Sequence, residues 1–246
     1  KALRTTMSIS SGRFDEAEQL TQQALAIGQR LRGQDATGVF GVHMFTLQRM
    51  RGRLNEIAPA VKMFVQDQSA SAAWRPGLAL IYAELGLEDE ARAEFEHLAT
   101  DDFAGIPTDG LWILCMAYLS EVCAFLDDPR RAAVLYEMTL PYHAQNIGMA
   151  GGVAYCGAVS RYLGMLAATM TRWEEAERHF EYALEMDANT GSWAWLAQTR
   201  YEYARMLLAR NGPDDREKAQ ALLDDALTAA AEFGMRSTEE KASALK

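Results

Sequence analysis

Apolar residues recur at helical spacing along nearly the whole chain, in stretches separated by short polar or glycine-containing turns. In the segment TRWEEAERHFEYAL, which begins at Thr171, the residues Ala176, Phe180 and Leu184 are four residues apart and share one face of an α-helix. This pattern predicts an all-α chain built from a repeated amphipathic helix. Similar segments begin at Gly12 (GRFDEAEQLTQQAL) and at Gly86 (GLEDEARAEFEHLA).

The copies align on one register position, which holds alanine in all copies but one. Neighbouring register positions lie 34 to 44 residues apart, which is the spacing of stacked helix pairs. A small side chain lets two helices approach closely, whereas a larger one would overpack the contact at a cost of about 1–3 kcal/mol. The helix before each copy carries a bulky residue followed by a small one. The register residues are Ala17, Ile57, Ala91, Ala132, Ala176 and Ala219, and the bulky-small pairs are Leu78-Ala79, Leu119-Ser120, Leu163-Gly164 and Tyr203-Ala204.

We therefore expect a single domain, residues 1–246, in which about six helix pairs stack into a curved rod. Glycine at the turns of several pairs is expected to supply a left-handed backbone conformation. Acidic residues at the start of the second helices complement the positive end of the helix dipole. The expected pairs cover about 1–31, 34–67, 70–100, 108–145, 151–187 and 190–234, followed by a C-terminal tail, 235–246.

The bulky-small pairs, Tyr82, the GxxxEA-like turns and Phe95 or Phe180 resemble tetratricopeptide repeats (TPR) over nearly the whole chain. Strings such as SRYLGMLAATMTRWEEAERHFEYAL resemble the C-terminal repeats of large bacterial signalling proteins. Those proteins carry a STAND-type ATPase domain and a nucleotide-cyclase or LuxR-type output domain. The resemblance implies an α-α superhelix, a TPR-like solenoid, that serves a regulator as a sensing or scaffolding arm.

The sequence departs from this resemblance in several ways. Its average repeat is longer than the roughly 34 residues of a standard TPR. It contains no Walker A pattern, no cyclase signature and no helix-turn-helix, so those activities would belong to other parts of the protein. The first residues, KALRTTMSIS, lack both an initiating Met and the pattern of a signal peptide, so we expect a piece of a longer protein.

The charge and composition of the chain limit the classes of partner that it can bind. The chain has 24 Lys+Arg against 34 Asp+Glu, a net charge of -10, which disfavours direct binding to nucleic acid or anionic membranes. The longest apolar run, Leu111 to Leu126, is interrupted by Ser120 and Glu121 and is shorter than the roughly 20 residues of a membrane span. The three cysteines show no metal or CxxC spacing, so we expect reduced, buried thiols in a cytoplasmic protein.

The sequence shows no pattern of catalytic residues. The four histidines are far apart, without an HExxH motif, and each is expected on a helix surface; no GxSxG motif occurs. We therefore expect no metal, no cofactor and no enzymatic activity. The glycine-rich segment NIGMAGGVAYCG, 146–157, matches no phosphate-binding pattern, and a flexible link between helix pairs is the favoured interpretation over an anion cradle.

A binding groove is expected on the concave side, which the first helix of each pair lines. Tyrosine and arginine next to the bulky-small pairs suit it, because they anchor interfaces well. The alternative is ordinary helix packing with Tyr and Arg hydrogen bonds inside the chain. The occupant is either a protein or peptide, including the parent ATPase domain or a second copy, or a small effector that the arm senses. The candidate groove residues are Tyr118, Glu121, Arg161, Tyr162, Met165, Tyr201, Glu202 and Arg205.

Overall fold

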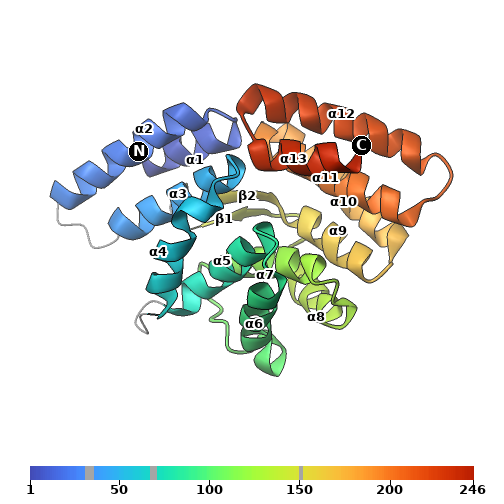
Figure 1. The fold of residues 1–246 in the computed structure, drawn as a ribbon, viewed down its shortest axis with the longest axis horizontal. Helices are drawn as coiled ribbons and strands as arrows, with labels where there is room; N and C mark the ends of the chain where they lie inside the picture. The colour runs from blue at the N-terminus through green and yellow to red at the C-terminus, as the bar shows by residue number, and fades with distance from the viewer. Residues whose placement is uncertain (31–35, 67–70, 150–151) are drawn as a thin grey trace. The chain divides into compact units, whose positions relative to one another are not determined.

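The computed structural model, which describes residues 1–30, 36–66, 71–149 and 152–246, is almost entirely helical. The described residues form thirteen α-helices, two short 3-10 helices and one sheet of two strands (Figure 1). The predicted all-α class is therefore confirmed. Among the described residues, no helix is both long enough and apolar enough to cross a bilayer.

Contacts between residues divide the chain into two compact units. The terminal unit comprises residues 1–53, 148–157 and 184–246, and the central unit comprises residues 54–147 and 158–183. Each unit combines segments that are far apart in the sequence. The repeat pattern, from which one domain was expected, does not indicate this division.

The terminal unit brings the first and the last helices of the chain together. Its helices are α1 (Ala2–Ser10), α2 (Phe14–Arg30), α3 (Ala36–Met50), α11 (Trp193–Arg210), α12 (Asp215–Phe233) and α13 (Arg236–Leu245). Besides the contacts of each helix with its neighbours along the chain, α1 contacts α11, and α13 contacts α3. In an open solenoid each repeat contacts only its neighbours. The packing of the first helices on the last therefore departs from the expected rod.

Two close contacts join these ends of the chain. Gly12, in the α1–α2 turn with φ +75°, lies so close to Phe233 at the end of α12 that an added Cβ would overlap its ring. The Nε2 group of Gln198 on α11 donates a hydrogen bond to Sδ of Met50 at the end of α3, at 3.1 Å. Only glycine adopts a left-handed conformation without strain. The α1–α2 turn therefore needs glycine for its backbone and for the space beside Phe233.

The central unit contains two of the expected helix pairs, each with its two helices in contact. Its elements are α4 (Leu54–Gln66), α5 (Ser71–Glu84), α6 (Glu88–Leu98), the 3-10 helix Thr100–Phe103, α7 (Trp112–Phe125), α8 (Pro129–Thr139), the 3-10 helix Leu140–Tyr142, α9 (Val159–Thr169) and the first part of α10 (Trp173–Asn189). Within pairs, α5 packs on α6 and α7 on α8. Between pairs, the first helices α5, α7 and α9 pack on one another in order. This is the neighbour-to-neighbour contact of a repeat array.

The register alanines are buried, as predicted. Two helices also approach closely at Gly164 of α9, where an added Cβ would lie 3.0 Å from ring atoms of Phe180 on α10. Glycine at position 164 is therefore required for this packing. The five register alanines, Ala17, Ala91, Ala132, Ala176 and Ala219, are fully buried at 0% exposure, and the remaining register residue, Ile57, is half-buried.

The glycine-rich segment differs from the flexible link that was expected. It contains β1 (Asn146–Gly148) and β2 (Tyr155–Ala158), which pair in the two-stranded sheet, while residues 150–151 lie outside the described part. Helix α9 consequently begins at Val159, later than the expected start of its pair. Strands of three and four residues are too short to show the alternation by which strands are recognised.

Candidate functional site

The eight predicted groove residues lie on three first helices, in both units. Helices α7 and α9 pack on each other in the central unit, whereas α11 belongs to the terminal unit. Whether they form one groove stays a prediction. Tyr118 and Glu121 are on α7, Arg161, Tyr162 and Met165 are on α9, and Tyr201, Glu202 and Arg205 are on α11.

The part of this set in the central unit is mostly buried. Arg161 is 2% and Tyr162 is 1% exposed, and the guanidinium of Arg161 lies 4.4 Å from the centroid of the Tyr162 ring. Its Nη2 group also donates a hydrogen bond to the hydroxyl of Tyr162. Tyr118 and Met165 are buried as well, and Glu121 is half-buried. The burial of these side chains favours the alternative to an open groove, in which they are covered inside the chain.

The part on α11 remains accessible. Tyr201, Glu202 and Arg205, called the α11 patch below, are all of intermediate exposure, and 16% of the Glu202 side chain is exposed. The Nε group of Arg205 donates a hydrogen bond to Oε2 of Glu202 at 2.8 Å, and 38% of the Arg205 side chain is exposed. This arrangement leaves an aromatic side chain and a charged pair on one helix face. Such groups can contact a partner without rearrangement of the core.

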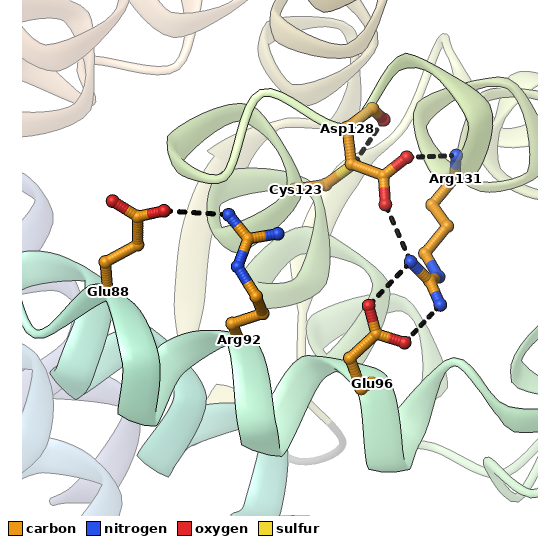
Figure 2. Close-up of polar contacts among 6 residues, drawn as sticks. All are labelled: Glu88, Arg92, Glu96, Cys123, Asp128 and Arg131. Carbon is orange, nitrogen blue, oxygen red and sulfur yellow. Dashed lines mark hydrogen bonds and ion pairs between the residues drawn. The ribbon is translucent and has the colours of Figure 1, made fainter.

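A charged network between α6 and the start of α8 joins two helix pairs of the central unit (Figure 2). Arg131 of α8 donates hydrogen bonds to both carboxylate oxygens of Glu96 on α6, one of them at 2.9 Å, and at 2.8 Å to Asp128. Asp128 also caps α8 by accepting from the backbone N–H of Arg131 at 3.1 Å. Burial raises the pKa of Asp128, but the hydrogen bonds and charge of Arg131 outweigh it and hold this pKa below its usual value. The network links the start of α8 to α6 through the Arg131–Glu96 ion pair.

Two other polar pairs in Figure 2 have structural roles too. The thiol of Cys123 donates to the backbone carbonyl of Asp128 at 3.3 Å, at the turn between α7 and α8. Arg92 pairs with Glu88 one turn away on α6, at 2.8 Å, with both side chains well exposed. An exposed pair of this kind contributes about 0.3–0.5 kcal/mol. All of these charges are paired within the unit, so the network offers no open binding site.

His179 of α10 lies in a second polar network of the central unit. Its Nε2 atom is 2.9 Å from the hydroxyl of Tyr136, and its Nδ1 atom is 3.5 Å from the hydroxyl of Ser160. Ser160 is fully buried and donates to the backbone carbonyl of His143 at 2.9 Å. Burial, reinforced by the charge of His143, lowers the pKa of His179 to about 4. The imidazole is therefore neutral at pH 7, and it lies between two hydroxyls, of which that of Ser160 is fully buried.

His43 corrects the expectation that every histidine lies on a helix surface. It is 1% exposed on α3, and its Nδ1 atom is 2.9 Å from the hydroxyl of Thr21. On the other side, Nε2 is 3.5 Å from the hydroxyl of Thr6, which donates to the carbonyls of Gly152 and Val153. Burial lowers the pKa of His43, against a smaller opposite effect of the Val153 carbonyl. The imidazole is therefore neutral and cross-links segments of the terminal unit.

The terminal unit also contains an open hollow of about 770 Å³. It lies between the α1–α2 turn and the neighbouring faces of α11 and α12. Its volume is within the range of about 300–1,000 Å³ that is typical of small-molecule sites. The hollow is lined by Ser11, Gly12, Arg13, Trp193, Leu196, Arg200, Asp225, Thr228, Ala229, Glu232 and Phe233.

The described residues give little support for a metal site or a reactive thiol. Among the described residues, no group of three or more His, Cys, Asp or Glu side chains is placed to hold a metal ion. Cys115, Cys123 and Cys156 are buried free thiols, as predicted. Burial raises the pKa of Cys115 to about 11, so its reactive thiolate form is scarce at neutral pH.

The structure thus offers two accessible features, the α11 patch and the hollow beside the α1–α2 turn. Neither corresponds to a catalytic arrangement that requires a metal or an activated thiol. No family model matches the sequence, and comparisons with curated proteins and with solved structures gave no match.

Proposed function

We propose that this chain is a non-catalytic interaction module, a TPR-like array of helix pairs that binds a protein or peptide partner through the α11 patch. The module would serve a larger bacterial regulator in the cytoplasm, as the resemblance of its repeats implies. The partner would be another protein, the parent ATPase domain or a second copy of this chain.

The observation that carries the proposal is the recurrence of one small, fully buried residue in the second helices. The alanines at positions 17, 91, 132, 176 and 219 are all inaccessible to solvent. When the buried face of each helix joins it to neighbouring helices, the opposite face remains exposed and can bind a partner. Extended surfaces of repeat arrays commonly bind other proteins.

The composition of the α11 patch supports a protein as the partner. Tyr201 offers a large, rigid contact area, and Arg205 offers a directed donor, the two features that anchor interfaces best. Glu202 holds Arg205 in place at 2.8 Å, which reduces the flexibility that binding would have to remove. The patch is on a first helix, where the groove of such an array is expected.

A capture experiment tests this function. The chain is immobilised and exposed to a bacterial lysate, and a captured protein is purified so that its dissociation constant can be measured by calorimetry. The double variant Tyr201→Ala, Arg205→Glu should weaken binding by at least about tenfold, because anchor residues each contribute more than about 1 kcal/mol. Self-association of the wild type is measured in parallel by sedimentation velocity, with the same variant.

The matched control is Arg216→Glu, which makes the same charge change at an exposed position of α12 in the same unit. It should bind as tightly as the wild type. Equal weakening by the control would show a general effect of charge instead of a contact. A wild-type chain that captures no protein and does not self-associate, or a double variant with unchanged affinity, contradicts the proposal.

A further inference from the structure

Two arginines and two acidic residues line the hollow beside the α1–α2 turn, and one of these acidic residues has no ion-pair partner among the described residues. Its two arginines are already paired: Arg13 with Glu16 at 2.8 Å and Arg200 with Asp225 at 3.3 Å. The remaining charged lining residue, Glu232, is exposed and has no ion-pair partner among the described residues. An incoming ligand therefore meets one carboxylate that no cation of the unit neutralises.

The same hollow exposes an unusually large aromatic surface. Trp193 is 46% exposed, although tryptophan is the side chain with the most apolar surface to bury. Leu196 and the ring of Phe233 line the hollow beside it. The indole is also the aromatic group that attracts cations most strongly through its face. Apolar walls, an open indole and a free carboxylate together favour a positively charged group on a hydrocarbon stem.

The hollow is fixed in position by the packing of the chain ends. Gly12 lies against the ring of Phe233, so the α1–α2 turn is held over the end of α12. This wall of the hollow is therefore formed before a ligand arrives, which lowers the entropic cost of binding. The net charge of -10 also draws cations toward the molecule and opposes the approach of anions.

We propose that this hollow binds an organic cation, with its alkyl stem against Trp193 and its ammonium or guanidinium group at Glu232. The cation is either the side chain of a lysine or arginine in a partner or a free amine. Both share the same chemistry. The proposal is independent of the α11 patch, because none of the three patch residues lines the hollow.

The test uses n-butylguanidinium as the probe and N-butylurea as its neutral counterpart of similar shape. Binding to the full chain is followed by NMR of the tryptophan indole N–H signals, in which Trp193 is assigned from the Trp193→Phe variant. Butylguanidinium should shift the Trp193 signal to saturation, and butylurea should not. Equal shifts with both compounds, or no shift of Trp193 with butylguanidinium, would overturn the proposal.

The variant Glu232→Gln removes the carboxylate with almost no change of shape, and it should weaken binding by about threefold to tenfold. Glu217→Gln makes the same change at an exposed position of α12 outside the hollow and should leave the affinity unaltered. Unchanged affinity in Glu232→Gln would also overturn the proposal. The peptide Gly-Arg-Gly separates the two sources: tighter binding than butylguanidinium supports a partner's side chain, and weaker binding supports a free amine.

Discussion

The contact between Gly164 and Phe180 allows a quantitative test of how the helix pairs are joined. In the Gly164→Ala variant, the new Cβ would lie 3.0 Å from ring atoms of Phe180, which is closer than carbon atoms normally approach. Phe180 is 1% exposed and enclosed, so its ring has little room to move away. Gly164→Ala should therefore overpack the contact between α9 and α10.

Two opposing effects set the size of this change. Alanine is favoured over glycine inside a helix by about 0.5–1 kcal/mol, whereas overpacking costs about 1–3 kcal/mol. Gly164→Ala should therefore lower the free energy of unfolding by up to about 2 kcal/mol. In the Phe180→Leu background the smaller side chain removes the clash, and the same change should stabilise by about 0.5–1 kcal/mol. The sign of the effect reverses, which a general effect of helix propensity cannot produce.

The assay has to report on the central unit, because a chain with two compact units need not unfold in one step. Hydrogen exchange of peptides from residues 159–183, measured against urea concentration, gives the local free energy of opening for the four proteins of the cycle. A coupling energy below about 0.5 kcal/mol between positions 164 and 180, or stabilisation by Gly164→Ala in both backgrounds, would refute the close contact.

Three further predictions concern polar side chains. The free energy of unfolding should fall as the pH drops from about 6.5 to about 4. Burial lowers the pKa values of His43 and His179 in the folded state, so the unfolded chain takes up more protons in this range. Urea midpoints measured across this range would show it, and a flat profile would contradict it. Asp128→Ala should lower the free energy of unfolding, measured by urea denaturation, by about 1 kcal/mol, since it removes the cap of α8 and an ion pair of Arg131. An unaltered urea midpoint would argue against that role of Asp128. Arg161→Glu should unfold the central unit, as seen in circular dichroism, because it places an unpaired carboxylate in the core; a folded variant that has only lost binding would show that Arg161 faces a groove after all.

The helix pairs and their register could be predicted from sequence because the signal is local. A helix shows its buried face by apolar residues three or four positions apart, and a small residue at a fixed place in each copy marks a close contact. Ala176 and Gly164 were both identified in this way. Contacts between distant segments leave no such signal. The burial of His43 depends on Thr6, Thr21 and residue 153, which come from three separate parts of the chain.

The candidate site could be predicted only in part, for a related reason. Counting from the bulky-small pair gives the helix position of a side chain, but it does not give the neighbour that covers it. Tyr162 and Tyr201 were chosen by the same rule, yet Tyr162 is buried and Tyr201 is of intermediate exposure. The hollow was missed because Gly12 and Phe233 meet only through packing of the two chain ends, which a pattern of neighbouring repeats does not encode.

The most direct test of the repeat architecture is a leucine scan of the six register positions, read as melting temperatures. Each replacement of alanine, at 17, 91, 132, 176 or 219, should lower the melting temperature by about 2–12 °C, because overpacking costs about 1–3 kcal/mol and each kcal/mol corresponds to about 2–4 °C in a chain of this size. Ile57→Leu, at the half-buried position that already holds a large side chain, should change it little. If the alanine variants melt with the wild type, or only Ile57→Leu is destabilised, the helix pairs are not joined at these residues.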